Sequence, residues 1–302
     1  MKIYLFNFIL LMFFSSCTSS TKSRFQPEDF FTGNLLPLAR YIYNDDAKAV
    51  KEYITKKGIS VDTADEKHGY CLLLYAINAE SKTTVKMLLE MGANPNELSA
   101  TKVYENGSDD YNIYNRYPLS NATYKEDLYF AKILLKYGAN PNLGNPLQVA
   151  IINTPKSSKY NMFDLLLENG ANINGLDKEH YTPLFLSVYI SRSDYANYFL
   201  DHGANVNIIC RNGETAAYRL QKNINRLNGE FREDYIKKVQ PTIDRFKARG
   251  VKFPVEKPNV PDSQKEAKPE TSNNQPQKPV SALPNQDRKK TWSIFFDDDE
   301  EV

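Results

Sequence analysis

The chain repeats one phrase four times, and this phrase decides the fold. It reads LLEMGANPNE from Leu88, LLKYGANPNL from Leu134, LLENGANING from Leu166 and FLDHGANVNI from Phe199. The shared glycines of the last three copies are separated by roughly 32 and 33 residues, which is the period of a solenoid repeat. The recurrence predicts a stack of supersecondary units that each contact mainly their neighbours.

Apolar residues lie three, four and seven positions before each shared glycine. In the last copy these residues are Leu200, Phe199 and Ala196, ahead of Gly203. This spacing places them in one stripe along a helix. The glycine then supplies a left-handed backbone conformation at no steric cost, so we expect the helix to end there.

A second apolar stretch recurs upstream of the phrase. It reads YPLSNA from Tyr117, NPLQVA from Asn145 and TPLFLS from Thr182. A proline near the first position of a helix, preceded by Thr or Asn as a cap, is typical of a helix start. One unit is therefore a helix, a turn, a second helix and an extended turn. Such a unit cannot bury its apolar stripe alone and must stack on its neighbours.

These motifs resemble the ankyrin repeat family. The family pattern T-P-L-H-x-A is best matched by Thr182-Pro183-Leu184, and the ending G-A-N/D-x-N is matched four times. Weaker copies over residues 36–58 and 213–250 look like the two terminal caps. The resemblance implies an all-α ankyrin-repeat solenoid of about six helix-turn-helix units with short hairpin loops over residues 34–253.

The start of the chain has the composition of a secretory signal. Lys2 precedes an unbroken apolar run from Ile3 to Phe14, and the small residues Ser15 and Ser16 follow. About a dozen apolar residues are too few to span a bilayer stably. We therefore expect residues 1–16 to be a cleaved signal peptide.

The stretch FSSC, which ends at Cys17, resembles a bacterial lipobox, although Phe14 is an unusual choice at its first place. The resemblance implies that Cys17 is diacylated, exposed by cleavage and N-acylated. Because Thr18 rather than Asp follows, it also implies transport to the outer membrane, facing the periplasm. Residues 17–33 are then a tether that joins a lipid anchor in a bacterial cell envelope to the solenoid.

Composition and motifs argue against several other classes of function. The formal net charge is +1 and no basic patch stands out, so we expect no nucleic-acid partner. Cys71 and Cys210 belong to separate units, some 30 Å apart at the spacing of packed helices, so they should not form a disulfide. The sequence has no P-loop, nucleophile elbow or zinc-ligand spacing. We therefore expect no cofactor, no metal, no small-molecule substrate and no enzymatic activity.

One insertion is rich in tyrosine. Compared with the later repeats, the connection after Gly92 is longer and includes ATKVYENGSDDYNIY, residues 100–114. Its Tyr104, Tyr111 and Tyr114 lie among Asn, Gly, Ser and Asp, a composition that antibody loops use for binding. A disordered insert whose tyrosines cover the flank of the solenoid is an equal alternative.

The next connection between repeats is shorter than usual rather than longer. It is shorter, from Gly138 to Pro146, so its hairpin should be stunted, and the following unit has a longer loop between its helices, Asn153 to Tyr160. An extended hairpin beside a truncated one predicts a notch on the binding side.

A column of residues is expected along the groove that first helices line in ankyrin proteins. It lies seven places after the Thr position of each T-P-L motif. Exposed apolar side chains in such a column indicate a partner surface, and Tyr is enriched among interface hot spots. The alternative is that some of these rings pack between units. The apolar members, proposed as protein-binding residues, are Tyr43, Tyr124, Ile152 and Tyr189, and the other two are Asn78 and Lys222.

The last part of the chain, residues 254–302, is expected to be a disordered tail. Its composition is rich in Pro, Gln, Asn, Ser and Lys and poor in apolar residues. It ends in TWSIFFDDDEEV, in which Trp292, Phe295 and Phe296 stand beside an acidic block. This end is either a docking motif for a partner or a solubilising tail.

The sequence thus favours a lipid-anchored scaffold or assembly protein that binds another protein through the solenoid groove and the insert. An immunity protein or inhibitor that neutralises a toxin or an enzyme is the alternative. An enzyme is the weakest hypothesis, because no pair of acids is singled out by the sequence.

Overall fold

The computed structural model describes residues 25–104, 111–154 and 159–258. Within them, six helix pairs follow one another along the chain, which confirms the expected solenoid of helix-turn-helix units. We number the pairs as repeats 1 to 6. They are α3 (Leu36–Tyr43) with α4 (Ala47–Lys57), α5 (Leu72–Asn78) with α6 (Lys82–Glu90), α7 (Pro118–Ala122) with α8 (Tyr129–Lys136), α9 (Pro146–Asn153) with α10 (Lys159–Glu168), α11 (Pro183–Tyr189) with α12 (Ser193–Asp201), and α13 (Ala216–Asn225) with α14 (Gly229–Ala248).

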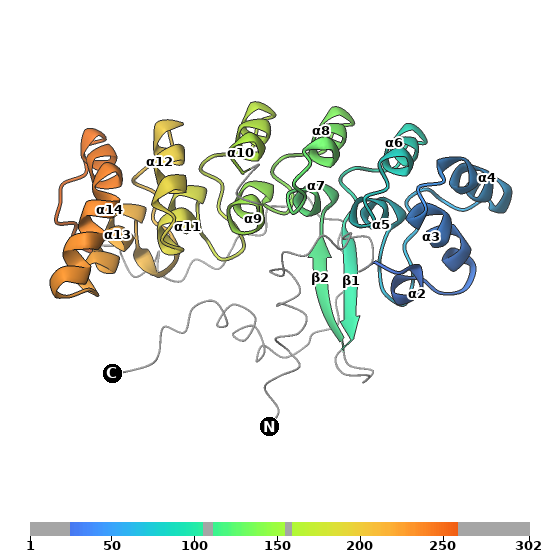
Figure 1. Cartoon of the computed structure of the whole chain (residues 1–302), viewed down its shortest axis with the longest axis horizontal. Coiled ribbons are helices and arrows are strands. Elements are labelled where there is room, and N and C mark those ends of the chain that lie inside the picture. The colour runs from blue at the N-terminus through green and yellow to red at the C-terminus, as the bar shows by residue number, and fades with distance from the viewer. Residues whose placement is uncertain (1–24, 105–110, 155–158, 259–302) are drawn as a thin grey trace, which may run out of the picture. The chain divides into compact units, whose positions relative to one another are not determined.

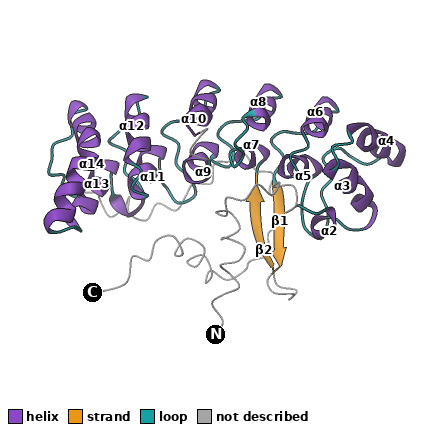
Figure 2. Ribbon diagram, viewed as in Figure 1, coloured by secondary structure: helices purple, strands orange, loops and turns teal. Residues whose placement is uncertain are grey.

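The first helices of the repeats form one row, and the second helices α4, α6, α8, α10 and α12 form another, which lies above the first row in Figure 1. Within the first row, α5 packs between α3 and α7, and α11 packs between α9 and α13. A two-stranded antiparallel sheet of β1 (Ser99–Tyr104) and β2 (Tyr111–Arg116) projects away from both rows, on the side of the first helices (Figure 2). We call the surface of the first row on this side the first-helix face.

Helix starts follow the motif that recurs in the sequence. The Thr182 hydroxyl accepts a hydrogen bond from the backbone N–H of Phe185 at 3.1 Å and so caps α11. The Thr215 hydroxyl caps α13 in the same way. In repeat 2 the equivalent place is taken by Cys71, whose Sγ accepts from the N–H of Leu74 at 3.4 Å. Cys71 and Cys210 are both buried free thiols.

The repeated Asn residues connect each repeat to the next, which explains why the phrase recurs. The side-chain oxygen of the second Asn in one copy accepts a hydrogen bond from the backbone N–H of the first Asn in the following copy. These bonds lie at exposed turns, and each gives a backbone N–H of the turn a partner in the neighbouring repeat. The links are Asn96 to Asn140 at 2.7 Å, Asn142 to Asn172 at 2.7 Å and Asn174 to Asn205 at 2.8 Å, and Asp62 accepts from Asn94 at 2.8 Å at the start.

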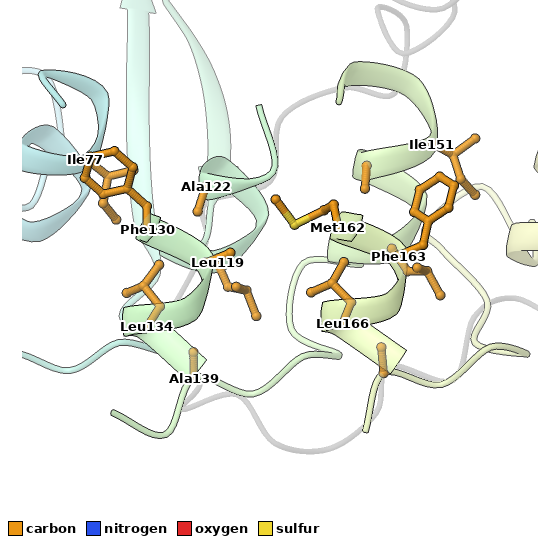
Figure 3. Close-up of a cluster of buried hydrophobic side chains, with 14 of the residues drawn as sticks. Ile77, Leu119, Ala122, Phe130, Leu134, Ala139, Ile151, Met162, Phe163 and Leu166 are labelled. Atoms are coloured by element: carbon orange, nitrogen blue, oxygen red, sulfur yellow. The ribbon is translucent and has the colours of Figure 1, made fainter. Parts of the chain in front are cut away.

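The apolar stripes of both helix rows meet in a continuous core that runs between repeats. Figure 3 shows one part of it, where side chains from repeats 2, 3 and 4 fill the space between helices. Phe130 and Phe163, from α8 and α10, are 1% and 0% exposed. Full burial of such a side chain contributes roughly 1.5–3 kcal/mol. Stacking thus stabilises each repeat through its neighbours.

Three short elements complete the described part: α2 (Pro27–Phe30), η2 (Gly33–Leu35) and η3 (Arg211–Gly213). Within that part of the chain no helix is both long and apolar enough to cross a membrane. The expected anchor at Cys17 and the tail motif of Trp292, Phe295 and Phe296 lie outside the described residues.

Candidate functional site

The tyrosine-rich insertion contains a β-hairpin. Its strands pair in register from Ser99 opposite Arg116 to Tyr104 opposite Tyr111, and Tyr114 pairs with Thr101. Two runs of β-branched and aromatic residues flank an Asn-Gly pair in this stretch, which is a strong hairpin signal. That signal could have predicted the strands from the sequence, and it favours an ordered insertion over a disordered one.

The base of the hairpin is tied to repeat 2 through Ser99, which is 1% exposed. Its hydroxyl donates to the carbonyl oxygen of Gly69 at 2.7 Å and accepts from the backbone N–H of Cys71 at 3.1 Å. Both partners belong to the segment that leads into α5. The direction in which the hairpin leaves the solenoid is therefore set by buried hydrogen bonds.

The shortened connection between α8 and α9 has no strand and packs against Tyr117, which follows β2 at the base of the hairpin. Gly144 has a φ of +71°, and a Cβ atom there would lie 2.5 Å from the ring of Tyr117. The Ser120 hydroxyl contacts the carbonyl oxygen of Gly144 at 2.9 Å. A long hairpin and a stunted turn are thus neighbours, as the lengths predict; the notch between them stays a prediction.

The residues of the expected groove column differ in how far their side chains are exposed. Tyr124 and Ile152, in the neighbouring repeats 3 and 4, are 41% and 39% exposed and are the exposed apolar members. Tyr43 and Tyr189 are half-buried, and Asn78 is only 4% exposed. The column therefore presents an apolar centre in repeats 3 and 4 rather than an even ladder along all six repeats.

Asn78 is buried because it is paired with the next repeat. The Asn121 side-chain amide donates to the Asn78 side-chain oxygen, and the Lys125 ammonium donates to the Asn78 carbonyl oxygen at 3.2 Å. Lys125 also forms an ion pair with Glu80 at 3.1 Å. Burial lowers the pKa of Lys125, and the neighbouring Glu80 partly offsets this effect. The polar groups at the junction of repeats 2 and 3 thus satisfy one another.

Residues 25–32, which we call the N-terminal arm, cover the first-helix face of repeats 1 and 2. The side-chain amide of Gln26 donates to the Tyr43 hydroxyl at 3.0 Å. The Tyr75 hydroxyl donates to the carbonyl oxygen of Phe25 at 2.8 Å. Part of the stretch that the sequence assigned to the tether is therefore packed on the solenoid. It contacts Tyr43, the first residue of the column.

Aromatic side chains hold the arm in place. The Phe31 ring is 1% exposed and meets the Tyr75 ring edge-on, with 4.8 Å between centroids. Phe30 meets Tyr70 in the same manner at 4.8 Å. Such pairs stabilise by about 0.5–1.5 kcal/mol beyond the area that they bury. The partners lie some forty residues further along the chain, so no local sequence pattern points to this contact.

Asp65 fastens the end of the arm. Its carboxylate accepts hydrogen bonds from the backbone N–H groups of Thr32 at 2.9 Å and His68 at 2.8 Å. Burial raises the pKa of Asp65, but the hydrogen bonds to His68 and Thr32 outweigh it, and the pKa lies below its ordinary value. The ionised form of Asp65 is therefore the one that binds the arm.

A stack of aromatic rings forms the later part of the first-helix face. The Tyr181 ring stacks on those of Phe185 and Tyr189, at 5.0 Å and 5.2 Å between centroids and with 21° and 29° between the ring planes. The guanidinium of Arg219 lies 4.3 Å from the Tyr189 ring centroid, and the buried Glu214 carboxylate is 3.7 Å from that guanidinium. Burial raises the pKa of Tyr181 to about 12. Phe185, Arg219 and Glu214 are buried, so the half-buried Tyr181 and Tyr189 are the rings of this group that reach the surface.

The described residues of the first-helix face offer a surface for contact. Among the described residues, no group of three or more His, Cys, Asp or Glu could hold a metal ion. Two titratable groups with shifted pKa values have structural partners: Asp65 holds the N-terminal arm, and Lys125 links repeats 2 and 3. The exposed apolar pair is Tyr124 and Ile152, and the half-buried Tyr181 and Tyr189 follow it along the same face.

Known proteins show the same repeat architecture. The chain is 30% identical over 152 residues to a protein of Acanthamoeba polyphaga mimivirus named as an ankyrin repeat protein, a match that covers 50% of this chain and 18% of the relative. It is 32% identical over 152 residues to an ankyrin repeat protein of Rickettsia bellii, over 48% of this chain and 40% of the relative. The chain thus spans less than half the length of either relative. No family model matches the chain.

Solved structures agree with these matches. The human ASB11 ankyrin repeat domain superposes with a TM-score of 0.51 at 20% identity, over 78% of this chain and 93% of that domain. The ankyrin repeat domain of Bcl-3, a member of the IkappaB protein family, gives a TM-score of 0.52 at 19% identity, over 72% of this chain and 86% of that domain. The fold expected from the repeated phrase is therefore confirmed.

Proposed function

We propose that this chain, an ankyrin repeat protein, binds another protein through its first-helix face in repeats 3 to 5 and through its β-hairpin, while a lipid at Cys17 holds it on a bacterial envelope membrane. The ankyrin-repeat fold generally mediates contacts between proteins, so a protein partner is the starting point. Fold alone does not name the partner or the purpose.

One observation carries the proposed binding surface. Tyr124 and Ile152 are exposed on successive repeats beside the base of the hairpin, while the equivalent face of repeats 1 and 2 is covered by the N-terminal arm. Large apolar side chains that cluster on an exposed face favour a partner site. Tyr is also among the residues that contribute most to binding energy.

The surface around this pair is pre-organised. The aromatic stack of Tyr181, Phe185 and Tyr189 is held by stacked ring contacts and by Arg219. Ser99 fixes the hairpin base through two hydrogen bonds. Little conformational freedom would be lost on binding here, which favours affinity.

The anchor is supported by the chain's first residues. An apolar run that ends in FSSC, with Cys17 last, resembles the signal of lipid-modified envelope proteins. Several acyl chains, at about 0.8 kcal/mol per buried CH₂, bind a membrane far more firmly than one chain does. Outer-membrane location, facing the periplasm, follows from Thr18 by the same resemblance.

Two roles fit such a surface, and they differ in the number of partners. A scaffold or assembly protein would use the first-helix face for one partner and the tail motif of Trp292, Phe295 and Phe296 for another. An immunity protein or inhibitor would use the rigid face and the hairpin, with Tyr104, Tyr111 and Tyr114, for one tight partner. Because the face is pre-organised, the inhibitor role is kept as a second candidate function alongside the scaffold role.

The test is a pull-down from membranes with the lipidated protein and matched variants. We expect the double variant Tyr124→Ala/Ile152→Ala to lose a partner that Phe231→Ala, on the 81% exposed Phe231 of α14, retains. Circular dichroism would show that each variant is folded. Retention of the whole set of bound proteins by the double variant would contradict the proposal.

Two further variants separate the roles. A triple Tyr104→Ala/Tyr111→Ala/Tyr114→Ala variant that loses the same single partner would favour the inhibitor. A truncation after Leu283 that loses a different partner would favour the scaffold. Metabolic labelling with a radioactive fatty acid, in the wild type and in Cys17→Ala, tests the anchor by itself.

A further inference from the structure

The first described residue of the chain lies over the middle of the first-helix face. The carbonyl oxygen of Phe25 accepts the hydrogen bond of Tyr75, on α5 of repeat 2. The ring of Phe25 is 5.9 Å from the ammonium of Lys125, which follows α7 of repeat 3. In Figure 1, α2 lies beside the first row, on the side from which the hairpin projects. The chain therefore joins the solenoid from this face.

This entry point is fixed rather than loosely placed. Behind it, Phe31 is buried against Tyr75, and Thr32 is bonded to Asp65. On the surface of the arm, Glu28 forms an ion pair with Arg40 at 2.8 Å. Whatever precedes Phe25 must start from this place on the first-helix face.

The number of residues between Cys17 and Phe25 limits the distance between a lipid anchor on Cys17 and the first-helix face. Phe25 lies eight positions after Cys17 in the sequence. A fully extended chain spans at most about 3.6 Å per residue, so Cys17 lies within about 29 Å of Phe25 whatever path the chain takes. An acyl group on Cys17 would keep the first-helix face of repeats 2 and 3 within this distance of the membrane surface.

The same limit disfavours the opposite orientation. The second-helix row lies behind the first, and each helix with its side chains is about 10 Å thick. To place the second row against the membrane, the tether would have to pass two layers, about 20 Å, and also run sideways around the repeats. Most of the tether's maximum length of about 29 Å would then be needed to cross the solenoid, and little would remain to reach the membrane.

The distance between the first-helix face and the membrane surface also limits the size of a partner that can bind between them. A compact domain of 100 residues has a radius of gyration of about 13 Å, which corresponds to a diameter of roughly 34 Å. Such a domain exceeds the tether's reach, whereas an extramembrane loop or a short segment of a membrane protein fits. Lys125, which follows Tyr124 in the sequence, has its ammonium 5.9 Å from the ring of Phe25, where the described chain begins.

We infer that the first-helix face is turned toward the membrane that carries the anchor, and that its partner is a protein embedded in or attached to that same membrane. This inference rests on the proposed lipid anchor and on the proposed binding face. It adds the class of partner: a membrane protein that presents a segment within about 29 Å of the lipid surface.

Energy transfer to the membrane tests the orientation. The lipidated protein is reconstituted into phosphatidylethanolamine–phosphatidylglycerol vesicles that contain an acceptor-labelled lipid. A donor dye is attached at Tyr124→Cys on the first-helix face, or at Lys136→Cys, which is exposed at the end of α8 in the same repeat. The native Cys71 and Cys210 are buried and should not react. Because two helix layers of about 10 Å separate the probes, we expect about twofold higher transfer from Tyr124→Cys. Equal transfer, or higher transfer from Lys136→Cys, would overturn the orientation.

A longer tether provides the matched control. Insertion of a flexible Gly-Ser linker of about 30 residues after Ser20 adds a root-mean-square reach of roughly 30 Å and should abolish the difference between the probes while the protein stays bound. A difference that survives this insertion would show that something other than the tether orients the solenoid, and would also overturn the inference.

The orientation can be tested even if the proposed anchor fails. If mass spectrometry finds no acyl groups on Cys17, a chain in which a hexahistidine tag replaces residues 1–17 is bound to vesicles with nickel-chelating lipid, and the two probes are compared again. The absence of acyl groups overturns the proposed anchoring, whereas equal transfer in the tagged chain overturns the geometric inference.

The class of partner has its own readout. A photocrosslinking amino acid in place of Ile152 is activated in intact cells, and the crosslinked protein is identified by mass spectrometry. A partner with a transmembrane segment or a lipid anchor of its own supports the inference. A soluble partner without either would overturn it, even if the first-helix face proves to be the binding surface.

Discussion

The first-helix face is covered by the chain itself in repeats 1 and 2, whereas it is exposed in repeats 3 and 4. The same place in the repeat has a different environment each time. Tyr43 accepts a hydrogen bond from Gln26 of the arm, Asn78 is buried against Asn121, and Tyr124 is 41% exposed. Position in the motif therefore places a residue on the face, but contacts from distant parts of the chain decide whether a partner can reach it.

The comparison also separates two kinds of residue on one surface. Those under the arm stabilise the fold, because their rings and hydroxyl groups are used within the chain. Those beyond the arm are available for binding. Substitutions in the covered part should change the free energy of unfolding, while substitutions in the exposed part should change binding and leave stability nearly unaltered.

The largest effect on stability is expected from the arm. Phe31→Ala removes a ring that is 1% exposed and leaves a cavity against Tyr75. We expect it to lower the free energy of unfolding by about 3–5 kcal/mol. Phe231→Ala, at an 81% exposed ring, should change it by at most about 0.5 kcal/mol. Denaturant titration measures both, and similar values for the two variants would mean that the arm is not part of the folded core.

The second-largest loss of stability is expected at Gly144, in the short connection between α8 and α9. Gly144→Ala meets both a positive φ and the ring of Tyr117 at 2.5 Å, whereas Gly92→Ala meets a φ of +92° and no atom within 4 Å. A left-handed conformation costs about 1–2 kcal/mol for a residue with a Cβ. Overpacking adds about 1–3 kcal/mol at Gly144 alone.

Thermal or denaturant unfolding of the two glycine variants side by side isolates that second contribution. A larger loss for Gly144→Ala supports close packing of the turn against Tyr117. Equal losses would show that the turn can move away from the hairpin base at little cost.

The Asn links between repeats should have a moderate effect. Asn142 accepts from the backbone N–H of Asn172 at 2.7 Å and donates to the carbonyl oxygen of Gly170 at 3.1 Å. Asn142→Ala removes these two exposed bonds, whose backbone groups water can then hydrate, and we expect a loss of about 0.5–1.5 kcal/mol. Asn161→Ala, at an exposed position of α10, is the control. Hydrogen exchange that rises at Asn172 only in the first variant would localise the effect.

The smallest effect is a dependence on pH at the end of the arm. The pKa of Asp65 is lowered in the folded protein, so its ionised form contributes stability above the ordinary value of 3.8, and this contribution is lost as the pH falls through the depressed folded pKa. The difference in stability between the wild type and Asp65→Asn should therefore shrink between about pH 5 and pH 3. A difference that is constant over this range would mean that the charge of Asp65 does not hold Thr32.

Local patterns in the sequence were sufficient for the repeat architecture. Helix stripes, the proline starts and the glycine ends act within one unit, so their spacing carries the fold. The hairpin had a local signal as well, because an Asn-Gly pair lies between two β-prone runs in residues 100–114. Its pairing register, with Tyr104 opposite Tyr111, is a result of the structure.

The coverage of the face could not be predicted in this way. Polar residues such as Gln26 and Glu28 give residues 17–33 the composition of a tether, but Phe30 and Phe31 find their partners at Tyr70 and Tyr75. Asn78 looks equivalent to Tyr124 by motif position, yet its environment is set by Asn121 of the next repeat. Both outcomes depend on contacts between residues about forty positions apart.

The most direct test of the binding face is crosslinking in living cells. A photocrosslinking amino acid replaces Tyr124 in one strain and Phe231 in another, since both side chains are exposed but only the first lies on the proposed surface. The account predicts a discrete crosslinked protein from position 124 that is absent from position 231. Crosslinking to the same proteins from both positions, or to none from position 124 while the hairpin residues still crosslink, would contradict it.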